Sequence, residues 1–251
     1  EQTGNVSSAK SGAPTVSTTI GGPTSTDPLC GGRQHPSKLF REVVMIAGII
    51  LAAGEARRMG QLKQLLPLGG KPMIWHVANA ACGSRLDPVL LVTGAGSDAV
   101  VSSLREFPIT TIHNENWADG QAGSVRTGLR GLPEETEAVL FLPADQPLIS
   151  AKLINALIDA YYRSGQSIIC PFYGVQRGAP VLFGWKEWKN ALSTLTGDQG
   201  ARQLIIAHPE AVHRMEVDSG ELFWDVDTPE DYQRMCDRFL LRHPEVKIID
   251  Q

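Results

Sequence analysis

The sequence predicts an α/β protein in which helices cover a mostly parallel β-sheet. From Val43 onward, short apolar runs alternate with stretches of helical periodicity, an order typical of parallel strands joined by helices. Hydrophobic residues make up 42% of the 251 residues and charged residues 20%, close to the average of globular proteins. Length and composition therefore allow one large α/β domain with a buried core.

Seven short apolar runs predict the strands. In chain order they cover residues 44–51, 88–93, 109–113, 138–142, 167–171, 179–183 and 212–217. Helical patterns lie between them at residues 72–82, 98–106, 124–132 and 151–164. Pro72 suits the first turn of the first of these helices. Thr228, followed by Pro229 and two acidic residues, predicts the N-cap of a final helix.

The first 42 residues form a separate region in this interpretation. Of the first 40 residues, 22 are Gly, Pro, Ser or Thr, and the few large apolar residues show no period. Such a segment cannot bury enough apolar surface to offset its loss of conformational entropy. We therefore expect a disordered arm over residues 1–42 and a folded domain over residues 43–251.

Several function classes are excluded by composition. The longest apolar stretch, residues 43–53, is far shorter than the roughly 18 residues of a membrane span. The net charge of -4 gives no basic surface for nucleic acid or anionic membranes. The four cysteines are scattered without a Cys-x-x-Cys pair, which argues against a zinc site or a disulfide framework. We expect a cytoplasmic protein that binds neither nucleic acid nor membrane.

A glycine-containing turn follows the first predicted strand. It begins with Leu51, Ala52, Ala53 and Gly54, and Arg58 and Lys63 follow. Backbone N–H groups of such a turn can approach phosphate oxygens, and the two cations can balance a triphosphate. The turn has neither the dinucleotide fingerprint nor the Walker A spacing. The alternative is a helix-capping turn with solvated basic side chains.

Two aspartates are candidate metal ligands. Asp145 follows an apolar strand, so it lies at the edge of the sheet where α/β proteins bind ligands. Mg²⁺ is commonly held by one or two carboxylates together with substrate phosphates, and Asp227 is the candidate second carboxylate. Because Asp227 stands directly before Thr228 and Pro229, a capping role is the stronger alternative on spacing alone. Asp225 is interpreted as a neighbour, not a third ligand.

A polar loop over residues 114–124 leads into a helical pattern. It could hold a base, a ribose or a phosphate, or it could be an ordinary turn with an N-cap. Within it Trp117 could stack on a ligand or cover the sheet. Arg126 could reach a phosphate or lie on a solvated helix face. The isolated histidines, among them His76, are interpreted as structural.

The order of these motifs resembles the MobA-like nucleotidyltransferases, and within them the molybdenum cofactor cytidylyltransferases, the MocA-like branch. The similarity extends over roughly residues 44–235. It is carried by residues 51–68, 70–74, 113–114, 119–120, 123–126, 142–147, 177–178, 197–202 and 225–229. The resemblance implies a three-layer, Rossmann-like nucleotidyltransferase fold with a mostly parallel central sheet.

The resemblance also implies roles for individual residues. Arg58, Lys63 and Asp145 would be catalytic, and Asp145 and Asp227 would bind Mg²⁺. Nucleotide-binding residues would be Leu51, Ala52, Ala53, Gly54, Arg58, Lys63, Asn114, Gly120, Ser124 and Asp145. Acceptor-binding residues would be Arg177, Gly178 and Arg202. Two positions depart from the family pattern, Ala56 where Ser is frequent and Ala179 where His is frequent, and both bear on the acceptor.

The implied reaction transfers CMP from CTP to the terminal phosphate of molybdopterin cofactor and releases pyrophosphate. An already ionised phosphate nucleophile needs no general base. Alternatives are a guanylyltransferase or another transferase of the same family that acts on a different phosphorylated small molecule. A non-catalytic protein that delivers cofactor to a molybdoenzyme or its maturation chaperone is a second class. A nicotinamide-dependent oxidoreductase is disfavoured by the missing fingerprint.

Overall fold

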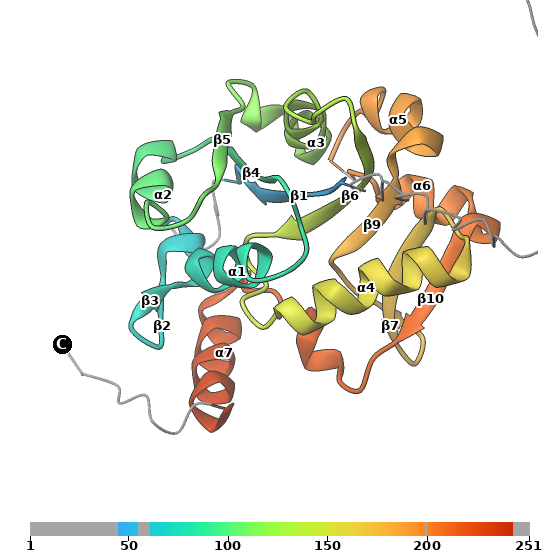
Figure 1. Ribbon diagram of the computed structural model, residues 1–251. Helices are drawn as coiled ribbons and strands as arrows, with labels where there is room; N and C mark the ends of the chain where they lie inside the picture. Colours follow the sequence, from blue (N-terminus) through green and yellow to red (C-terminus); the bar gives the residue numbers. More distant parts are fainter. Residues whose placement is uncertain (1–44, 55–60, 199, 243–251) are drawn as a thin grey trace, which may run out of the picture. The chain divides into compact units, whose positions relative to one another are not determined.

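A central sheet organises the domain. The computed structural model describes residues 45–54, 61–198 and 200–242, and the predicted arm lies outside these ranges. In the described part of the chain, eight strands form this sheet in the order β10-β7-β9-β6-β1-β4-β5, with β8 added beside β7. Helices cover both faces, so the structure has the three layers expected (Figure 1).

All seven predicted strands are present. The strands of the sheet are β1 (Met45–Ala52), β4 (Val89–Thr93), β5 (Thr110–His113), β6 (Thr136–Pro143), β7 (Ile168–Tyr173), β8 (Gln176–Arg177), β9 (Val181–Gly184) and β10 (Val212–Glu216). The central and flanking pairs β1·β4, β1·β6, β4·β5 and β7·β10 are parallel, whereas β9 runs antiparallel to β6 and β7. The sheet is therefore mixed but mostly parallel, as predicted.

The helices divide between the two faces. They are α1 (Met73–Cys82), α2 (Ser97–Ser103), α3 (Gln121–Leu129), α4 (Ala151–Ser164), α5 (Trp185–Ser193), α6 (Arg202–Ala207) and α7 (Pro229–Arg242). The first core lies under α1, α2 and α4, and the second lies under α3, α5 and α6. Figure 1 shows α1 and α4 on one side of the sheet and α3 and α5 on the other. Adjacent β1 residues alternate between these cores, because Ile49 packs in the second and Ile50 in the first.

A third, smaller core joins distant parts of the chain. A two-stranded hairpin, β2 (Pro67–Leu68) and β3 (Lys71–Pro72), lies beside α7, and Leu68, Met73, Met235 and Phe239 share this core. The Tyr232 hydroxyl donates a 2.5 Å hydrogen bond to the Pro67 carbonyl oxygen. The last helix is therefore fastened to the segment that directly follows the glycine turn.

The structure differs from the prediction at several elements. Helix α5 was not predicted, although Trp185, Trp188 and Leu192 recur at helical spacing and are buried. The hairpin β2–β3, the short strand β8 and helix α6 were also not predicted. The predicted helix over residues 124–132 begins three residues earlier, at Gln121. No helix in the described ranges is long and apolar enough to cross a membrane.

Candidate active site

The carboxyl ends of four parallel strands define one edge of the sheet. The registers pair Ala52 with Thr93, Thr93 with His113, and Leu51 with Pro143. The loops that follow β1, β5 and β6 therefore meet at this edge, where ligands bind in α/β sheets. Their residues surround a cavity of about 730 Å³.

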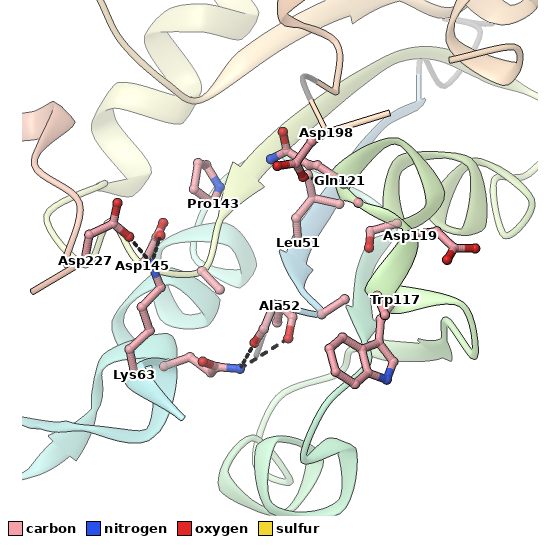
Figure 2. A pocket seen from close by; sticks show the side chains of 17 residues that line it. Leu51, Ala52, Lys63, Trp117, Asp119, Gln121, Pro143, Asp145, Asp198 and Asp227 are labelled. Carbon is pink, nitrogen blue, oxygen red and sulfur yellow. Dashed lines mark hydrogen bonds and ion pairs between the residues drawn. The ribbon is translucent and has the colours of Figure 1, made fainter. Parts of the chain in front are cut away.

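The cavity brings together most of the predicted nucleotide-binding residues. It is lined by Leu51, Ala52, Ala53, Gly54, Lys63, Gln64, Trp117, Ala118, Asp119, Gly120, Gln121, Ser124, Pro143, Ala144, Asp145, Asp198 and Asp227. Arg58 and Ala56 lie outside the described residues. Figure 2 shows Lys63 reaching toward Asp145 and Asp227 on one side of the cavity, with Trp117 and Asp119 on the other.

Lys63 connects the two candidate metal ligands. Its Nζ donates to Asp145 Oδ2 at 2.7 Å and to Asp227 Oδ1 at 2.6 Å. The Lys63 side chain is only 17% exposed, so burial by itself would lower its pKa. The charges and hydrogen bonds of Asp145 and Asp227 outweigh that effect and raise the pKa of Lys63. The ammonium is therefore held charged between two carboxylates.

The capping alternative for Asp227 is wrong. The last helix is capped by a reciprocal pair, in which Asp231 N–H donates to Thr228 Oγ1 at 3.1 Å and Thr228 N–H donates to Asp231 Oδ2 at 3.0 Å. Thr228 is thus the cap, as predicted. The Asp227 carboxylate reaches Lys63 instead. Asp227 follows a short 3₁₀ helix, η4 (Gly220–Phe223), whereas Asp145 follows the strand β6.

Asp225 lies within electrostatic reach of the same pair. Partial burial raises its pKa, and the negative charges of Asp145 and Asp227 raise it further. Within the described ranges, no group of three or more His, Cys, Asp or Glu residues is arranged to hold a metal ion. The carboxylates of Asp145 and Asp227, which Lys63 brings together, are the candidate protein donors for a cation at this edge.

These carboxylates fit a hard divalent cation. Both approach one ammonium nitrogen within 2.7 Å, so a small cation at that place reaches an oxygen of each. The described lining contains four aspartates and one lysine, so a polyphosphate in this cavity needs additional positive charge. Carboxylate oxygens supplemented by phosphate oxygens are the usual surroundings of Mg²⁺.

Gln64 is a site residue that the sequence analysis did not single out. Its side chain is buried, and Nε2 donates to the carbonyl oxygens of Ala52 at 3.3 Å and Gly54 at 3.4 Å. A glutamine amid leucines in residues 62–66 is the signal that could have identified it, because a buried amide must find partners. Gln64 fixes the backbone at the start of the glycine turn.

The loop after β5 supplies the opposite side of the cavity. It contains a 3₁₀ helix, η2 (Trp117–Asp119), and ends at Gly120, whose φ of 104° suits glycine. A Cβ at Gly120 would lie 2.9 Å from the Gly197 carbonyl oxygen, so only glycine fits. Trp117 is half-buried and lines the cavity, where a ligand can contact it.

Two predicted polar residues of this region, Ser124 and Asn114, differ in their access to the cavity. Ser124 lines the cavity from the first turn of α3 and is not an N-cap. Asn114 is buried behind it, and its Nδ2 donates to Ser124 Oγ at 3.1 Å. Arg126 points elsewhere, because it donates to the Leu195 carbonyl oxygen. Ser124 can therefore contact a ligand directly, whereas Asn114 contacts Ser124 from behind.

The predicted acceptor residues lie outside the lining of this cavity. Arg177 ends β8 and is half-buried, and Gly178 packs so closely on Phe223 that a Cβ would lie 2.1 Å from the ring. Burial lowers the pKa of Arg177, and the charge of Arg202 lowers it further. The two guanidinium groups are thus electrostatic neighbours. Among the described residues neither forms an ion pair with a carboxylate.

His76 has the structural role expected for it. Its Nε2 lies 2.8 Å from the Leu68 carbonyl oxygen, and its ring packs edge-on against Trp75 and Phe239. It lies in the region of the third core and is absent from the cavity lining.

A comparison with known protein families matches the model of the MobA-like NTP transferase domain over residues 48–212. The chain belongs to this family. The match spans the sheet from within β1 to the start of β10, so it includes Lys63 and Asp145 but ends before Asp227. The resemblance stated from the motifs is confirmed at the level of the family, and the protein is a nucleotidyltransferase of the MobA-like family.

Two curated relatives cover most of the chain. The purine catabolism protein PucB of Bacillus subtilis is 32% identical over 197 residues, which are 74% of this chain and 94% of PucB. The nicotine blue oxidoreductase of Paenarthrobacter nicotinovorans is 26% identical over 197 residues, which are 76% of this chain and 96% of that protein.

A solved structure shares the fold. The homologue of Mycobacterium tuberculosis Rv0371c from Mycobacterium sp. strain JC1 superposes with a TM-score of 0.70 at 28% sequence identity. The superposition covers 80% of this chain and 99% of that one. Nearly all of that chain therefore aligns with this one.

Proposed function

We propose that this MobA-like transferase moves CMP from CTP to the terminal phosphate of molybdopterin cofactor and releases pyrophosphate. The observation that carries the proposal is the Lys63–Asp145–Asp227 cluster at the end of a cavity that starts from the Ala52-Ala53-Gly54 turn. This places cation-binding groups beside a backbone turn that can approach phosphates. The cytidylyl branch resembles this chain in its Ala-Ala-Gly turn.

The proposed chemistry is an in-line displacement at the α-phosphorus of CTP. An oxygen of the acceptor phosphate forms a new bond to that phosphorus, the bond to the bridging oxygen breaks, and pyrophosphate leaves with the electron pair. The acceptor phosphate is already ionised, so no side chain has to remove a proton. Accordingly, the described lining offers no histidine or cysteine, and its residues bind, orient and balance charge.

A bound Mg²⁺ would neutralise the triphosphate and the leaving pyrophosphate. Asp145 and Asp227 would hold it. When these carboxylates serve the metal, the Lys63 ammonium becomes available to phosphate oxygens. In the free protein Asp145 and Asp227 raise the pKa of Lys63 and keep it charged, and the negative phosphate oxygens would take over that role when the two carboxylates hold the metal.

The decisive experiment measures pyrophosphate release from each of the four NTPs with molybdopterin cofactor supplied. We expect release with CTP that requires the cofactor and Mg²⁺. A preference for GTP would refute the cytidylyl assignment but would still support a nucleotidyltransferase activity. Binding of cofactor without release from any NTP would favour the non-catalytic delivery protein.

A second candidate follows from one relative, which bears the name nicotine blue oxidoreductase. The glycine turn of this chain lacks the dinucleotide fingerprint, which counts against nicotinamide chemistry. Absorbance of NADH or NADPH with the relative's dye as substrate distinguishes the two candidates. Oxidation of the nicotinamide without added NTP would replace the transferase proposal.

The Ala53 side chain is expected to contribute to base selection. Ala53 is buried, lines the cavity and belongs to the second core, against which Trp117 packs. Its methyl narrows the space for a base, which penalises a purine more than a pyrimidine. Ala53→Gly should lower the kcat/KM ratio of CTP over GTP by roughly tenfold without reversing it. Ala52→Gly makes the same change one residue earlier, at a lining residue that packs in the opposite core, so it should change the ratio less. An equal effect of both substitutions would contradict the prediction.

Arg177 is expected to bind the acceptor. Its guanidinium is partly desolvated beside that of Arg202, and two such groups suit a phosphate ester. Arg177→Ala should raise the KM for molybdopterin cofactor by about tenfold or more and leave the KM for CTP nearly unchanged. Arg163→Ala, an exposed position on α4, serves as control. An unchanged KM for the cofactor would remove Arg177 from the acceptor site.

A further inference from the structure

The side-chain amide of Asn114 has only one possible orientation. Its Oδ1 accepts a 3.2 Å hydrogen bond from the backbone N–H of Asn116, which cannot act as an acceptor. The amide oxygen therefore faces Asn116, and Nδ2 faces Ser124 Oγ at 3.1 Å. The Asn114 backbone N–H donates to the Thr93 carbonyl oxygen at 2.8 Å, which fixes this residue to the end of β4.

This orientation determines the polarity of the Ser124 hydroxyl. Since Nδ2 donates, Ser124 Oγ must accept, and its own hydrogen remains for another partner. In the described part of the chain the Ser124 side chain makes no other hydrogen bond. Ser124 lines the cavity while Asn114 does not. The unused hydrogen is thus available to a ligand in the cavity.

We propose that Asn114 is a positioning residue that makes the Ser124 hydroxyl a hydrogen-bond donor toward the nucleobase. The site then selects a base that presents an acceptor at Ser124, as cytosine does with its adjacent N3 and O2 atoms. A base with an N–H group at that position would face the hydroxyl hydrogen and lose the contact. This inference rests on the proposed function, because it requires a nucleotide in the cavity.

The test reverses the hydrogen-bonding direction of the Ser124 hydroxyl while the side chain at position 114 keeps its shape. In Asn114→Asp an ionised carboxylate can only accept, so it keeps the bond from Asn116 and takes the hydrogen of Ser124. The hydroxyl then presents lone pairs to the base. Asn114→Ala releases the hydroxyl, which can still rotate to donate. Ser124→Ala removes it, and Asn114→Asp in the Ser124→Ala background keeps the carboxylate but has no hydroxyl to reorient.

Calorimetric binding of CTP in the presence of Mg²⁺ is measured for the wild type, these four variants and Asn114→Ala in the Ser124→Ala background, with thermal melting to verify folding. We expect Ser124→Ala to weaken CTP by about tenfold and Asn114→Asp by at least as much. Asn114→Ala should weaken it less than Ser124→Ala. In the Ser124→Ala background either Asn114 substitution should change CTP affinity by less than about twofold.

If the Asn114 substitutions lowered CTP affinity equally with and without the Ser124 hydroxyl, the inference would be overturned, since Asn114 would then act on the fold alone. Unchanged CTP affinity in a folded Asn114→Asp variant would also overturn it. If Asn114→Asp does not fold, the coupling between Asn114→Ala and Ser124→Ala decides the question without a buried charge. Wild-type binding by Ser124→Ala, or no binding by any form, would instead refute the proposed nucleotide position.

Discussion

Asp145→Asn is expected to lower the rate of pyrophosphate release on the order of 10³-fold. This corresponds to a loss of several kcal/mol of transition-state stabilisation. The amide keeps the shape of the carboxylate and can still accept from Lys63 Nζ, now 2.7 Å from Asp145 Oδ2, but it loses the charge that holds a divalent cation. Because the side chain is partly exposed and outside the three cores, thermal melting should change little.

Asp159→Asn is the matched control for this experiment. Asp159 is a half-exposed aspartate of α4 that pairs with Arg85 at 2.6 Å, and it is not among the residues that line the cavity. Its replacement should leave turnover and Mg²⁺ dependence as in the wild type. Near-normal turnover of Asp145→Asn would refute its metal role. Asp227→Asn should resemble Asp145→Asn, and normal turnover there would limit Asp227 to pairing with Lys63.

Lys63→Ala is expected to lower kcat/KM for CTP on the order of 10²-fold or more, because the charge that balances the triphosphate is removed. Binding of Mn²⁺ or Mg²⁺ without nucleotide should become tighter. The Lys63 ammonium occupies both carboxylates in the free protein and so competes with a metal ion for them. Opposite changes in turnover and metal affinity are the characteristic result.

Lys71→Ala controls for the loss of a lysine in the same region. Lys71 is on β3, pairs with Glu106 at 3.3 Å and is half exposed, so its loss should affect neither turnover nor metal binding. If Lys63→Ala lost metal binding together with turnover, its ammonium would be a structural partner of the two aspartates. Wild-type kinetics would exclude Lys63 from phosphate binding.

The parallel sheet could be predicted because its strands are buried on both faces and appear as continuous apolar runs. The start of α3 could not, because its first donors are satisfied from far along the chain. The Gln121 N–H donates to Asp198 Oδ1 at 3.3 Å, and the Ala122 N–H donates to the Gly197 carbonyl oxygen at 3.2 Å. A local pattern therefore placed the helix start at Ser124, the first residue that resembles a cap.

Some site residues could be predicted from the local sequence, and others depend on contacts between distant parts of the chain. Lys63 and Asp145 could be predicted because each follows a strand that ends at one edge of the sheet. For Asp227, local spacing favoured capping, and only the fold shows that Thr228 and Asp231 cap the helix between them. The leucines around Gln64 could have indicated that its amide is buried, but the two carbonyl oxygens that it contacts are known only from the fold.

The attachment of α7 to the hairpin β2–β3 has a consequence for biosynthesis. Lys63 and Asp227 are 164 residues apart in sequence, and the Tyr232–Pro67 contact that fastens α7 spans 165 residues. Domains generally fold as units during synthesis, and the sheet itself is completed only by β10 at Val212–Glu216. The contact between Lys63 and Asp227 can therefore form only after nearly the whole domain has been synthesised, and a chain that ended before Asp227 would lack one of the two carboxylates that Lys63 contacts.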